Sequence, residues 1–424
     1  MNLEQLHQLF LVHHTVCTDT RKLTKDALFF ALKGPNFNGN AFAQYALEQG
    51  AALAIVDEAE FHVVGKTLLV DDVLTTLQQL ATFHRHYCQA RIIAITGSNG
   101  KTTTKELLYA VLAQKYRTIA TQGNLNNHIG VPLMLLNIRQ DTEFAIVEMG
   151  ANHQGEIALL AELAQPDYGY ITNFGKAHLE GFGGVAGVIK GKSELYNHLF
   201  ANDRHVFLNA DDPIQRDKLA TYFKKIGFSQ SDHQYYNITL TAEEPFLALT
   251  FEDLTIQTQL IGNYNFPNCC AAITVGKYFG VDHNRIKKAI ESYIPTNNRS
   301  QLLTKNGLTV VLDAYNANPT SMKAALESFA KRKGDPKTVF LGDMFELGET
   351  AQEEHQRIAD LAAGLGFDAL FLVGAHFEKV TSPYFKFPSF EALANHLKQH
   401  PLKEGQVLIK GSRGMAMERI LTID

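Results

Sequence analysis

The chain has 424 residues, of which 45% are hydrophobic and 20% charged, a composition typical of a globular protein with about three domains. Its formal net charge of −5 argues against nucleic acid or an anionic membrane surface as a partner. The first residues lack the basic start and apolar core of a signal peptide, and no apolar run reaches membrane-spanning length. Four cysteines without a CxxC pattern predict reduced thiols in a cytoplasmic protein.

Residues 1–88 are predicted to form a small α/β domain, because short helical and strand patterns alternate along them. We expect helices over residues 3–11, 41–50 and 74–87, and strands over residues 27–31, 52–56 and 67–70. Two polar, turn-rich loops at residues 17–21 and 33–40 connect these elements. Each loop could be a binding surface or an ordinary connection, because most loops are polar whatever their function.

Residues 89–296 are predicted to form a doubly wound parallel sheet, because apolar strand patterns alternate with helical ones. We expect strands over residues 91–96, 117–120, 144–149, 168–172 and 205–208, and helices over residues 101–114, 153–164, 185–200, 266–279 and 283–292. Residues 235–260 alternate in the manner of a small antiparallel addition. The polar segment 295–300 indicates a linker to the next domain.

Residues 297–424 are predicted to form a second, Rossmann-like α/β domain, because the same alternation resumes there. We expect strands over residues 308–313, 337–341, 369–373 and 406–410, and helices over residues 319–332, 352–365, 388–398 and 413–420. The whole chain therefore predicts three α/β domains, with the doubly wound sheet in the middle.

The stretch 91–104 has the order of elements that holds a phosphate group: an apolar strand, a glycine turn, and a helix that opens with Lys101 and Thr102. Backbone N–H groups of such a turn point at phosphate oxygens, the lysine neutralises the outer phosphates, and the threonine hydroxyl ligates Mg²⁺. The turn is shorter than the usual GxxxxGKS/T pattern, because Ile95 stands where the first glycine falls. The alternative is an ordinary glycine-rich turn beside a surface lysine.

Further polar residues follow predicted strands at their carboxyl ends, where ligands bind in parallel sheets. Glu148 lies at the end of such a strand, and could supply an oxygen to Mg²⁺ or simply face water. His178 follows the next strand, and a ligand role is no better supported there than a surface or core position. Lys192 lies on a predicted helix, and the residue pattern by itself assigns it no role.

Four more loops carry amides or charges. An amide-rich loop at residues 124–132 could cap the following helix or bond a polar ligand. In the last domain, loops at residues 313–319, 342–348 and 410–414 each follow a predicted strand. Three such loops at one edge of a parallel sheet indicate a binding site more strongly than any one of them does alone.

These motifs, in this order, resemble those of the Mur ligase family along nearly the whole chain. The matching segments read TGSNGKTT, NLNNHIGVP, EMGANHQGEI, TNFGKAHLEGFG, KSEL, DAYNANP, GDMFELG and KGSR. The last three are most similar to those of family members that add D-alanyl-D-alanine. The resemblance implies a UDP-sugar-binding domain over residues 1–88, an ATP-binding domain over 89–296 and a domain for the incoming dipeptide over 297–424.

The resemblance also implies roles for single residues. Those implied for ATP are Gly97, Ser98, Asn99, Gly100, Lys101, Thr102, Thr103, Asn263, Asn265, Asn268, Arg299 and Asp313. Those implied for two Mg²⁺ ions are Thr102, Glu148, His178 and a carbamylated Lys192, and those implied for catalysis are Lys101, Glu148, His178 and Lys192. Those implied for the substrates are Asp19, Thr20, Arg21, Asn38, Asn126, Asn127, Asn316, Asn318, Asp343, Glu346, Lys410 and Arg413.

The implied reaction belongs to peptidoglycan synthesis and is catalysed by a monomer. The terminal carboxylate of UDP-N-acetylmuramoyl-tripeptide (UDP-MurNAc-tripeptide) attacks the γ-phosphate of ATP, and the amine of D-alanyl-D-alanine then attacks the acyl phosphate. The third residue of the tripeptide, diaminopimelate or lysine, stays open. The chain departs from the family pattern at Leu312, where an aspartate is usual, at Asn38 and Asn40, where aspartate and histidine are usual, and at Tyr264, where histidine is usual.

Three alternative functions stay open from the sequence. One is a sibling ligase with the same chemistry and another substrate, such as folate polyglutamylation, although the DAYNANP segment argues against it. The second is a switch or motor that hydrolyses ATP without ligation. The third is a non-catalytic nucleotide-binding partner protein, against which the intact set of Lys101, Thr102 and Glu148 argues.

Overall fold

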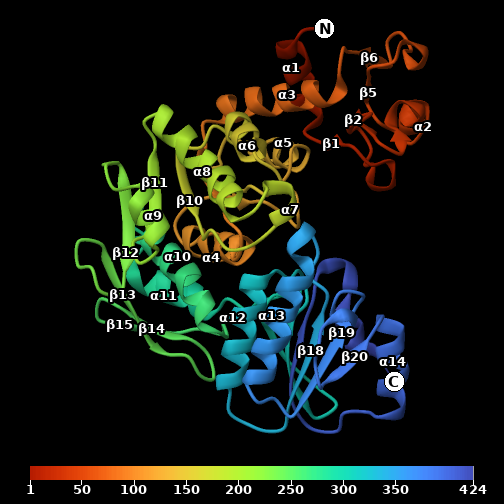
Figure 1. Cartoon of the computed structure of the whole chain (residues 1–424). Coiled ribbons are helices and arrows are strands. Elements are labelled where there is room, and N and C mark those ends of the chain that lie inside the picture. The colour runs from red at the N-terminus through yellow and green to blue at the C-terminus, as the bar shows by residue number, and fades with distance from the viewer. Residues whose placement is uncertain (424) are drawn as a thin grey trace. The chain divides into compact units, whose positions relative to one another are not determined.

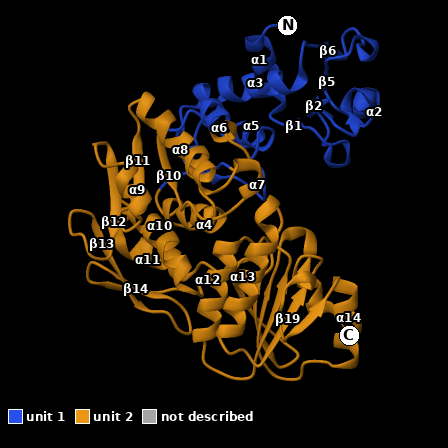
Figure 2. Ribbon diagram, in the orientation of Figure 1, with its two compact units in different colours: residues 1–94, 116–149, 158–167 blue, residues 95–115, 150–157, 168–424 orange. Residues whose placement is uncertain are grey.

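The structure of the protein is a computed structural model that describes residues 1–423 (Figure 1). Helices and mainly parallel strands alternate along it, which confirms the predicted α/β class. The chain falls into two compact units (Figure 2): unit 1 comprises residues 1–94, 116–149 and 158–167, and unit 2 comprises residues 95–115, 150–157 and the chain from 168 onward. The domain boundaries expected after residues 88 and 296 stay predictions. No helix among residues 1–423 is both long and apolar enough to cross a bilayer.

Unit 1 contains a small parallel sheet with the strand order β1-β2-β5-β6. Its strands and helices are β1 (Val16–Cys17), β2 (Leu28–Phe30), β5 (Leu53–Val56), β6 (Thr67–Leu69), α1 (Leu3–His13), α2 (Ala43–Glu48) and α3 (Val73–Cys88), beside a ribbon of β3 (Lys33–Gly34) and β4 (Phe37–Asn38). The core includes Phe29, Ala54 and Val56. The helix predicted over 41–50 begins later, at Ala43, because Asn38 caps a separate 3₁₀ turn first.

A nine-stranded sheet runs in the order β15-β14-β13-β12-β11-β10-β7-β9-β8. Its strands are β7 (Arg91–Thr96), β8 (Thr118–Ala120), β9 (Phe144–Glu148), β10 (Tyr168–Ile171), β11 (His205–Asn209), β12 (Lys225–Ser229), β13 (Tyr236–Ala242), β14 (Ala248–Phe251) and β15 (Leu254–Gln257). Strands β10 to β13 pair in parallel, as do β8 and β9, whereas β13, β14 and β15 pair antiparallel. The predicted doubly wound sheet and its antiparallel addition are therefore confirmed.

The helices of this region follow the predicted order with two differences. They are α4 (Lys101–Leu112), α5 (Gly130–Leu135), α6 (Glu156–Ala164), α7 (Leu179–Phe182), α8 (Val185–Ala201), α9 (Pro213–Lys218), α10 (Phe266–Tyr278) and α11 (His283–Glu291). Helix α6 begins three residues later than predicted, because the Glu156 carboxylate accepts from the N–H groups of Asn152 and His153 and closes a turn there. Helices α5, α7 and α9 were not predicted, because six residues or fewer show too little periodicity.

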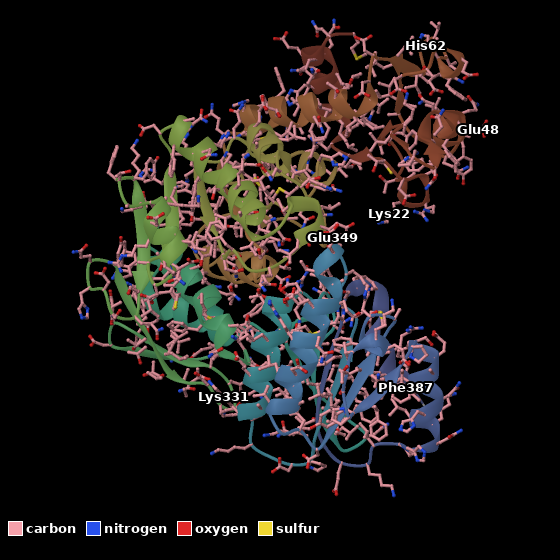
Figure 3. All side chains as sticks on the ribbon, in the orientation of Figure 1. Lys22, Glu48, His62, Lys331, Glu349 and Phe387 are labelled. Carbon is pink, nitrogen blue, oxygen red and sulfur yellow. The ribbon has the colours of Figure 1, made fainter. Side chains whose placement is uncertain are left out.

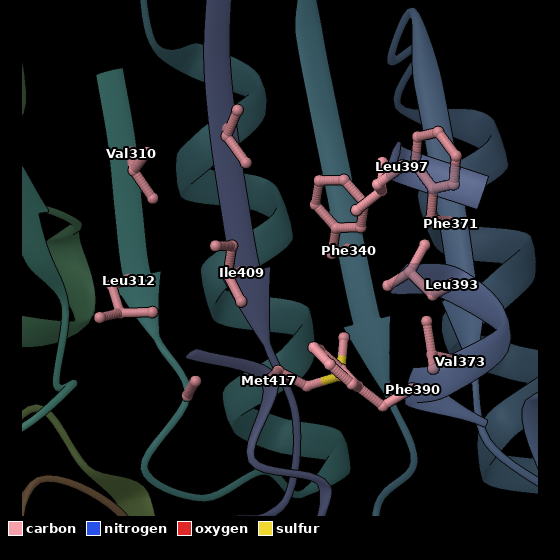
Figure 4. Packing of buried hydrophobic residues seen from close by; sticks show 12 residues of the cluster. Val310, Leu312, Phe340, Phe371, Val373, Phe390, Leu393, Leu397, Ile409 and Met417 are labelled. Carbon is pink, nitrogen blue, oxygen red and sulfur yellow. The ribbon is translucent and has the colours of Figure 1, made fainter. Parts of the chain in front are cut away.

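The last part of the chain forms a six-stranded sheet in the order β16-β17-β21-β18-β19-β20. Its elements are β16 (Gln301–Lys305), β17 (Leu308–Asp313), β18 (Lys337–Gly342), β19 (Ala369–Val373), β20 (Phe385–Phe387), β21 (Gly405–Lys410), α12 (Pro319–Lys331), α13 (Ala351–Gly364) and α14 (Phe390–Gln399). All strands except β16 run parallel, which confirms the second α/β domain. Leu312, where the family pattern has an aspartate, lies in the apolar core with Phe340 and Met417 (Figure 4).

The helix predicted over residues 413–420 is wrong. Two short 3₁₀ helices, Arg413–Met415 and Met417–Thr422, stand there instead, and Ala416 between them has a left-handed φ of 46°. The break turns the fully buried side chain of Met417 into the core against Phe390 (Figure 4). A continuous α-helix over residues 413–420 would have no left-handed residue at position 416. We therefore attribute the break to the packing of Met417 in the core.

Candidate active site

The turn after β7 has a backbone that only glycine can follow. Gly97 and Gly100 have φ angles of +133° and +82°. A Cβ atom on Gly97 would lie 2.0 Å from Thr172 Oγ1, and one on Gly100 would lie 2.6 Å from Asn268 Oδ1. Both positions therefore need glycine for conformation and for space. No side chain caps the start of α4 at Gly100, and the N–H groups at the start of a helix attract anions.

Lys101, the first residue of α4, reaches back over this turn. Its Nζ donates to the carbonyl oxygen of Gly97 at 2.7 Å and to that of Ser98 at 3.3 Å. Thr102 and Thr103 follow in the buried first turn of the helix. The cation is thus held beside the N–H groups of the helix start, which is the arrangement that binds a phosphate.

The loop after β10 holds the glycine turn in place. Asn173 is the main support: its carbonyl oxygen accepts from Ser98 N at 3.0 Å, its Oδ1 accepts from Asn99 N at 3.2 Å, and its Nδ2 donates to Asn99 O at 3.0 Å. Thr172 Oγ1 also donates to Asn99 O, at 2.6 Å, and Ser98 Oγ donates to Gly175 O at 2.6 Å. The sequence analysis missed Thr172 and Asn173 as supports, although Thr172 ends a predicted strand and Asn173 directly follows it.

The asparagines expected near adenine lie at the start of α10. Asn268 Oδ1 accepts from Thr104 Oγ1 at 3.0 Å, and Asn268 Nδ2 donates to Asn265 Oδ1 at 2.9 Å. Asn265 Nδ2 in turn donates to Ile261 O at 2.9 Å, and both residues are buried. These amides join α10 to α4 beside the glycine turn, and the adenine contact, with Asn263 in the preceding 3₁₀ turn, stays a prediction.

Lys192 on α8 is fully buried. Its Nζ donates to Ala151 O at 3.1 Å and lies 4.8 Å from the centre of the Phe182 ring. Burial, followed by the charge of Lys101, holds the pKa of Lys192 well below its usual range. Such surroundings favour the uncharged amine more than water does, and the uncharged amine is the nucleophilic form of lysine.

The side chains of His178 and Glu346 contact each other through Nδ1 and Oε2, although the two residues belong to different predicted domains. His178 precedes α7 with a left-handed φ of 52°, and Glu346 has a left-handed φ of 61°. The hydrogen bond to His178 lowers the pKa of the Glu346 carboxyl. The residue expected at Mg²⁺ and a residue expected at the dipeptide therefore contact each other.

Glu148, at the end of β9 in unit 1, is a buried carboxylate. Its Oε1 accepts from Asn126 Nδ2 at 2.9 Å, and its backbone N–H donates to Thr121 Oγ1 at 2.9 Å. Asn127 caps the turn before α5, where its Oδ1 accepts from Gly130 N at 2.8 Å. Residues 1–423 contain no group of three or more histidine, cysteine, aspartate or glutamate side chains placed to hold a metal ion.

Two predicted site residues of the last domain pair with each other. Lys410 Nζ donates to Asp313 Oδ2 at 2.6 Å and to Asn316 O at 3.3 Å, and Lys410 is buried. Asp313 Oδ1 accepts from Ser300 N at 3.1 Å, and Ser300 Oγ lies 2.9 Å from Tyr264 Oη. Tyr264, where the family pattern has histidine, therefore helps to tie the linker to the tip of β17.

Arg299 and Arg413 share one aromatic ring. The guanidinium carbon of Arg299 lies 3.5 Å from the centre of the Tyr315 ring, and that of Arg413 lies 5.2 Å from it. Asn316, the next residue, is exposed, and its Oδ1 accepts from Ala317 N at 2.9 Å. The structure thus brings Arg299, Asp313, Lys410 and Arg413 together around one loop, and Tyr315 was missed.

The last domain also contacts the glycine turn directly. Asn318 caps α12, where its Oδ1 accepts from Ser321 N, and its Nδ2 donates to Asn99 Oδ1 at 2.7 Å. Lys176 N donates to Thr320 Oγ1 at 2.9 Å, and Lys176 Nζ donates to Glu354 Oε1 at 2.5 Å. Lys176 and Glu354 were not predicted, because nothing in a sequence pairs residues so far apart.

Asp343, expected at the dipeptide, is buried and accepts from the protein itself. Its Oδ2 accepts from His376 N at 2.9 Å, and its Oδ1 accepts from Phe377 N at 2.9 Å. His355 lies beside it, fully buried, and accepts from Met344 N at 2.9 Å. Burial lowers the pKa of His355, so this imidazole is neutral. These bonds shape the loop after β18 on which Glu346 stands.

The residues expected at the UDP group lie in unit 1. Asp19 accepts from the Arg21 guanidinium at 2.9 and 2.8 Å, which lowers the pKa of Asp19 to about 2. Thr20 lies between them in a 3₁₀ turn. Asn38 Oδ1 accepts from Asn40 Nδ2 at 3.0 Å. Asn40 is fully buried, and its side chain also exchanges two hydrogen bonds with Asp57. The departures at Asn38 and Asn40 thus stabilise their own loop.

Family models for the Mur ligases match the chain in three consecutive segments. The Mur ligase family catalytic domain matches residues 12–85, the Mur ligase middle domain matches residues 95–276, and the Mur ligase glutamate ligase domain matches residues 298–413. Together these models cover most of the chain, including the glycine turn after β7 and the loops after β10 and β17.

Curated relatives and solved structures agree with these matches. UDP-N-acetylmuramoyl-tripeptide–D-alanyl-D-alanine ligase of Bacillus subtilis is 36% identical over 97% of this chain and 93% of the relative, and that of Escherichia coli is 34% identical over 96% and 92%. MurF from Acinetobacter baumannii has 31% identity and a TM-score of 0.84 over 98% of this chain and 97% of that one. MurF from Thermotoga maritima in complex with ADP has 28% identity and a TM-score of 0.86 over 97% of each chain.

Proposed function

Because this chain belongs to the Mur ligase family, we propose that it joins D-alanyl-D-alanine to UDP-MurNAc-tripeptide in an ATP-dependent ligation. The product is the UDP-MurNAc-pentapeptide from which peptidoglycan is built. The observation that carries this proposal is the likeness, over nearly the full length, to ligases named for this reaction. The three alternatives that the sequence left open lack any comparable support.

The geometry around the glycine turn supports a reaction at the γ-phosphate of ATP. A carboxylate and a triphosphate repel each other, so the site must supply positive charge where they meet. Lys101 lies over the turn, and Arg299 lies in the linker with its guanidinium against the Tyr315 ring. We infer that these cations neutralise the phosphates and the acyl phosphate formed from them.

Mg²⁺ fits the oxygen donors that the chain offers. Mg²⁺ prefers carboxylate and hydroxyl oxygens, and Glu148 presents a buried carboxylate while Thr102 presents a hydroxyl at the start of α4. We propose that Thr102, Glu148, His178 and a carbamylated Lys192 hold two such ions, which would neutralise phosphate charge. His178 would then exchange its contact with Glu346 for the metal.

The surroundings of Lys192 suit a carbamate. The neutral amine attacks CO₂, the new N–C bond forms as one C=O π bond of CO₂ opens, and one proton leaves to solvent, so the neutral amine becomes an anionic carbamate. The lowered pKa of Lys192 favours the neutral amine, and the nearby charge of Lys101 favours the anion that results. We propose this modification because a carbamate, unlike an ammonium group, can ligate a metal ion.

The remaining roles are proposals from the family resemblance. We propose that residues 1–88 bind the UDP sugar through Asp19, Thr20, Arg21 and Asn38, and that the last domain receives the dipeptide. The contacts of Thr320 with Lys176 and of Glu346 with His178 support this proposal, because Lys176 and His178 follow β10 in the middle part of the chain. Such contact excludes water from an acyl phosphate, which would otherwise hydrolyse.

Phosphate release with each substrate omitted in turn tests this function. We expect release to need ATP, UDP-MurNAc-tripeptide and D-alanyl-D-alanine together, and to fall below detection in Lys101→Ala and in Glu148→Gln. Release that is independent of both peptides would favour an ATP-hydrolysing switch. Near-normal turnover of either variant would refute the site assignment.

A further inference from the structure

Tyr315 stands at the centre of the cations of the last domain. Its ring contacts the guanidinium groups of Arg299 and Arg413, with 3.5 and 5.2 Å from ring centre to guanidinium carbon. Arg299 belongs to the linker and Arg413 to the segment after β21, so the ring joins two parts of the chain that are far apart in sequence. Tyr315 itself follows β17 by two residues.

The backbone around Tyr315 fixes where the ring lies. Tyr315 N donates to Asn298 O at 3.1 Å, and Ser300 N donates to Asp313 Oδ1 at 3.1 Å. These two bonds hold the linker against the tip of β17 on either side of Arg299. The position of the Arg299 guanidinium on the ring is therefore built into the loop.

The charges around the ring are unbalanced. Asp313 is ion-paired with Lys410 at 2.6 Å, so this carboxylate is already matched, while Arg299 and Arg413 lie against a neutral ring. The buried Nε of Arg299 has no hydrogen-bond partner among residues 1–423. A guanidinium stacked on a ring keeps its N–H groups in its own plane, where they can bind phosphate or carboxylate oxygens.

We propose that Tyr315 is a positioning residue that orients Arg299 toward the nucleotide and Arg413 toward the peptide substrates. This inference rests on the proposed function, because that function assigns the two arginines to different substrates. One ring then sets both cations at once, so a change in Tyr315 affects the binding of both substrates. The attraction of the two cations to the face of the ring carries this role, and the phenol hydroxyl is not needed.

Steady-state kinetics of Tyr315→Phe and Tyr315→Leu test the role of the ring. We expect Tyr315→Phe to stay within about twofold of the native kcat/KM, because the ring face remains. We expect Tyr315→Leu to lose about fivefold to thirtyfold in kcat/KM, with a higher KM for both ATP and D-alanyl-D-alanine. The matched control is Phe390→Leu, which removes the ring that Arg419 covers at 3.8 Å in the same domain, and it should keep both KM values.

A substitution that preserves shape separates orientation from packing. Pentafluorophenylalanine at position 315 keeps the ring but reverses the charge distribution of its face. We expect both KM values to rise relative to Tyr315→Phe, with an unchanged melting temperature. Equal KM values for the two variants would overturn the inference, whether or not Tyr315→Leu folds.

Arginine variants distinguish failure of this inference from failure of the proposed function. Arg299→Ala should raise the KM for ATP and Arg413→Ala the KM for D-alanyl-D-alanine. In the Arg299→Ala background, Tyr315→Leu should have little further effect on the KM for ATP. If both arginine variants keep native KM values, the assignment of the arginines is wrong. If they raise KM but loss of the ring does not, Tyr315 has no positioning role.

Discussion

The ion pair between Lys176 and Glu354 tests whether activity needs the contact between the loop after β10 and helix α13. Lys176 Nζ lies 2.5 Å from Glu354 Oε1, and the Glu354 side chain is only 8% exposed while that of Lys176 is 36% exposed. Replacing Lys176 by methionine keeps the length of the side chain and removes its charge. The Glu354 carboxylate then keeps only Arg357, at 3.4 Å, as a charged partner.

The expected loss lies between that of a surface pair and that of a buried one. Exposed pairs contribute about 0.2–1 kcal/mol, and breaking a fully buried pair costs about 3–5 kcal/mol. Since Lys176 is partly exposed and Arg357 compensates in part, we expect about 1–2 kcal/mol, or about fivefold to thirtyfold in kcat/KM. The loss should fall on kcat/KM for D-alanyl-D-alanine more than on nucleotide binding, because the pair holds the last domain.

A double-mutant cycle with Lys176→Met and Glu354→Gln measures the pair itself. We expect the double variant to be no worse than Lys176→Met alone, because the uncompensated carboxylate is gone. The matched control is Lys331→Met, since Lys331 (Figure 3) pairs with Glu243 at 2.8 Å but is 55% exposed. Additive losses in the cycle, or a loss from Lys176→Met no larger than that from Lys331→Met, would refute the reasoning.

Three further predictions follow from single contacts. Lys192→Ala should be inactive and regain part of its turnover with added acetate, and full activity without acetate would exclude the carbamate. Burial and then His84 lower the pKa of His7 to about 4, below about 6.5 in the unfolded chain, so stability falls as pH drops from 6.5 to 4 by up to about 1.4 kcal/mol per pH unit. His7→Phe should lessen that loss in hydrogen exchange of α1. Gly97→Ala should weaken ADP binding about tenfold or more in a titration with circular dichroism unchanged, because its Cβ would lie 2.0 Å from Thr172 Oγ1.

Local patterns made much of the fold predictable from the sequence. The strand, glycine turn and helix around Lys101 lie within a few residues of one another, so the signal needs no distant partner. The longer parallel strands are buried on both faces, so their sequences are continuous apolar runs. Such a run at residues 91–96 predicted a buried strand there. Apart from the helix expected over residues 413–420, each predicted helix and strand has a counterpart in the structure.

Short or tertiary-dependent elements escaped prediction for physical reasons. Strand β12 has five residues, one of them Gly227, whose Cβ would lie 2.7 Å from Leu208 Cδ2, so close packing rather than propensity selects it. Strand β16 is only partly buried and pairs antiparallel with β17. The segment after Arg413 follows the burial of Met417 instead of helix periodicity.

The position of a polar residue at a strand tip was predictable, but the partner of its side chain was not. Asn318 and Asp343 both follow parallel strands, as expected of ligand-binding residues, yet their hydrogen bonds go to Asn99 and to the N–H groups of His376 and Phe377. The Asn99–Asn318 bond joins residues 219 positions apart. A loop that binds a substrate also needs hydrogen bonds that hold its own backbone. Polar residues in such a loop can therefore either bind the substrate or stabilise the loop. Only three-dimensional contacts tell the two apart, and here they make Asn318 a link between α12 and the glycine turn at Asn99.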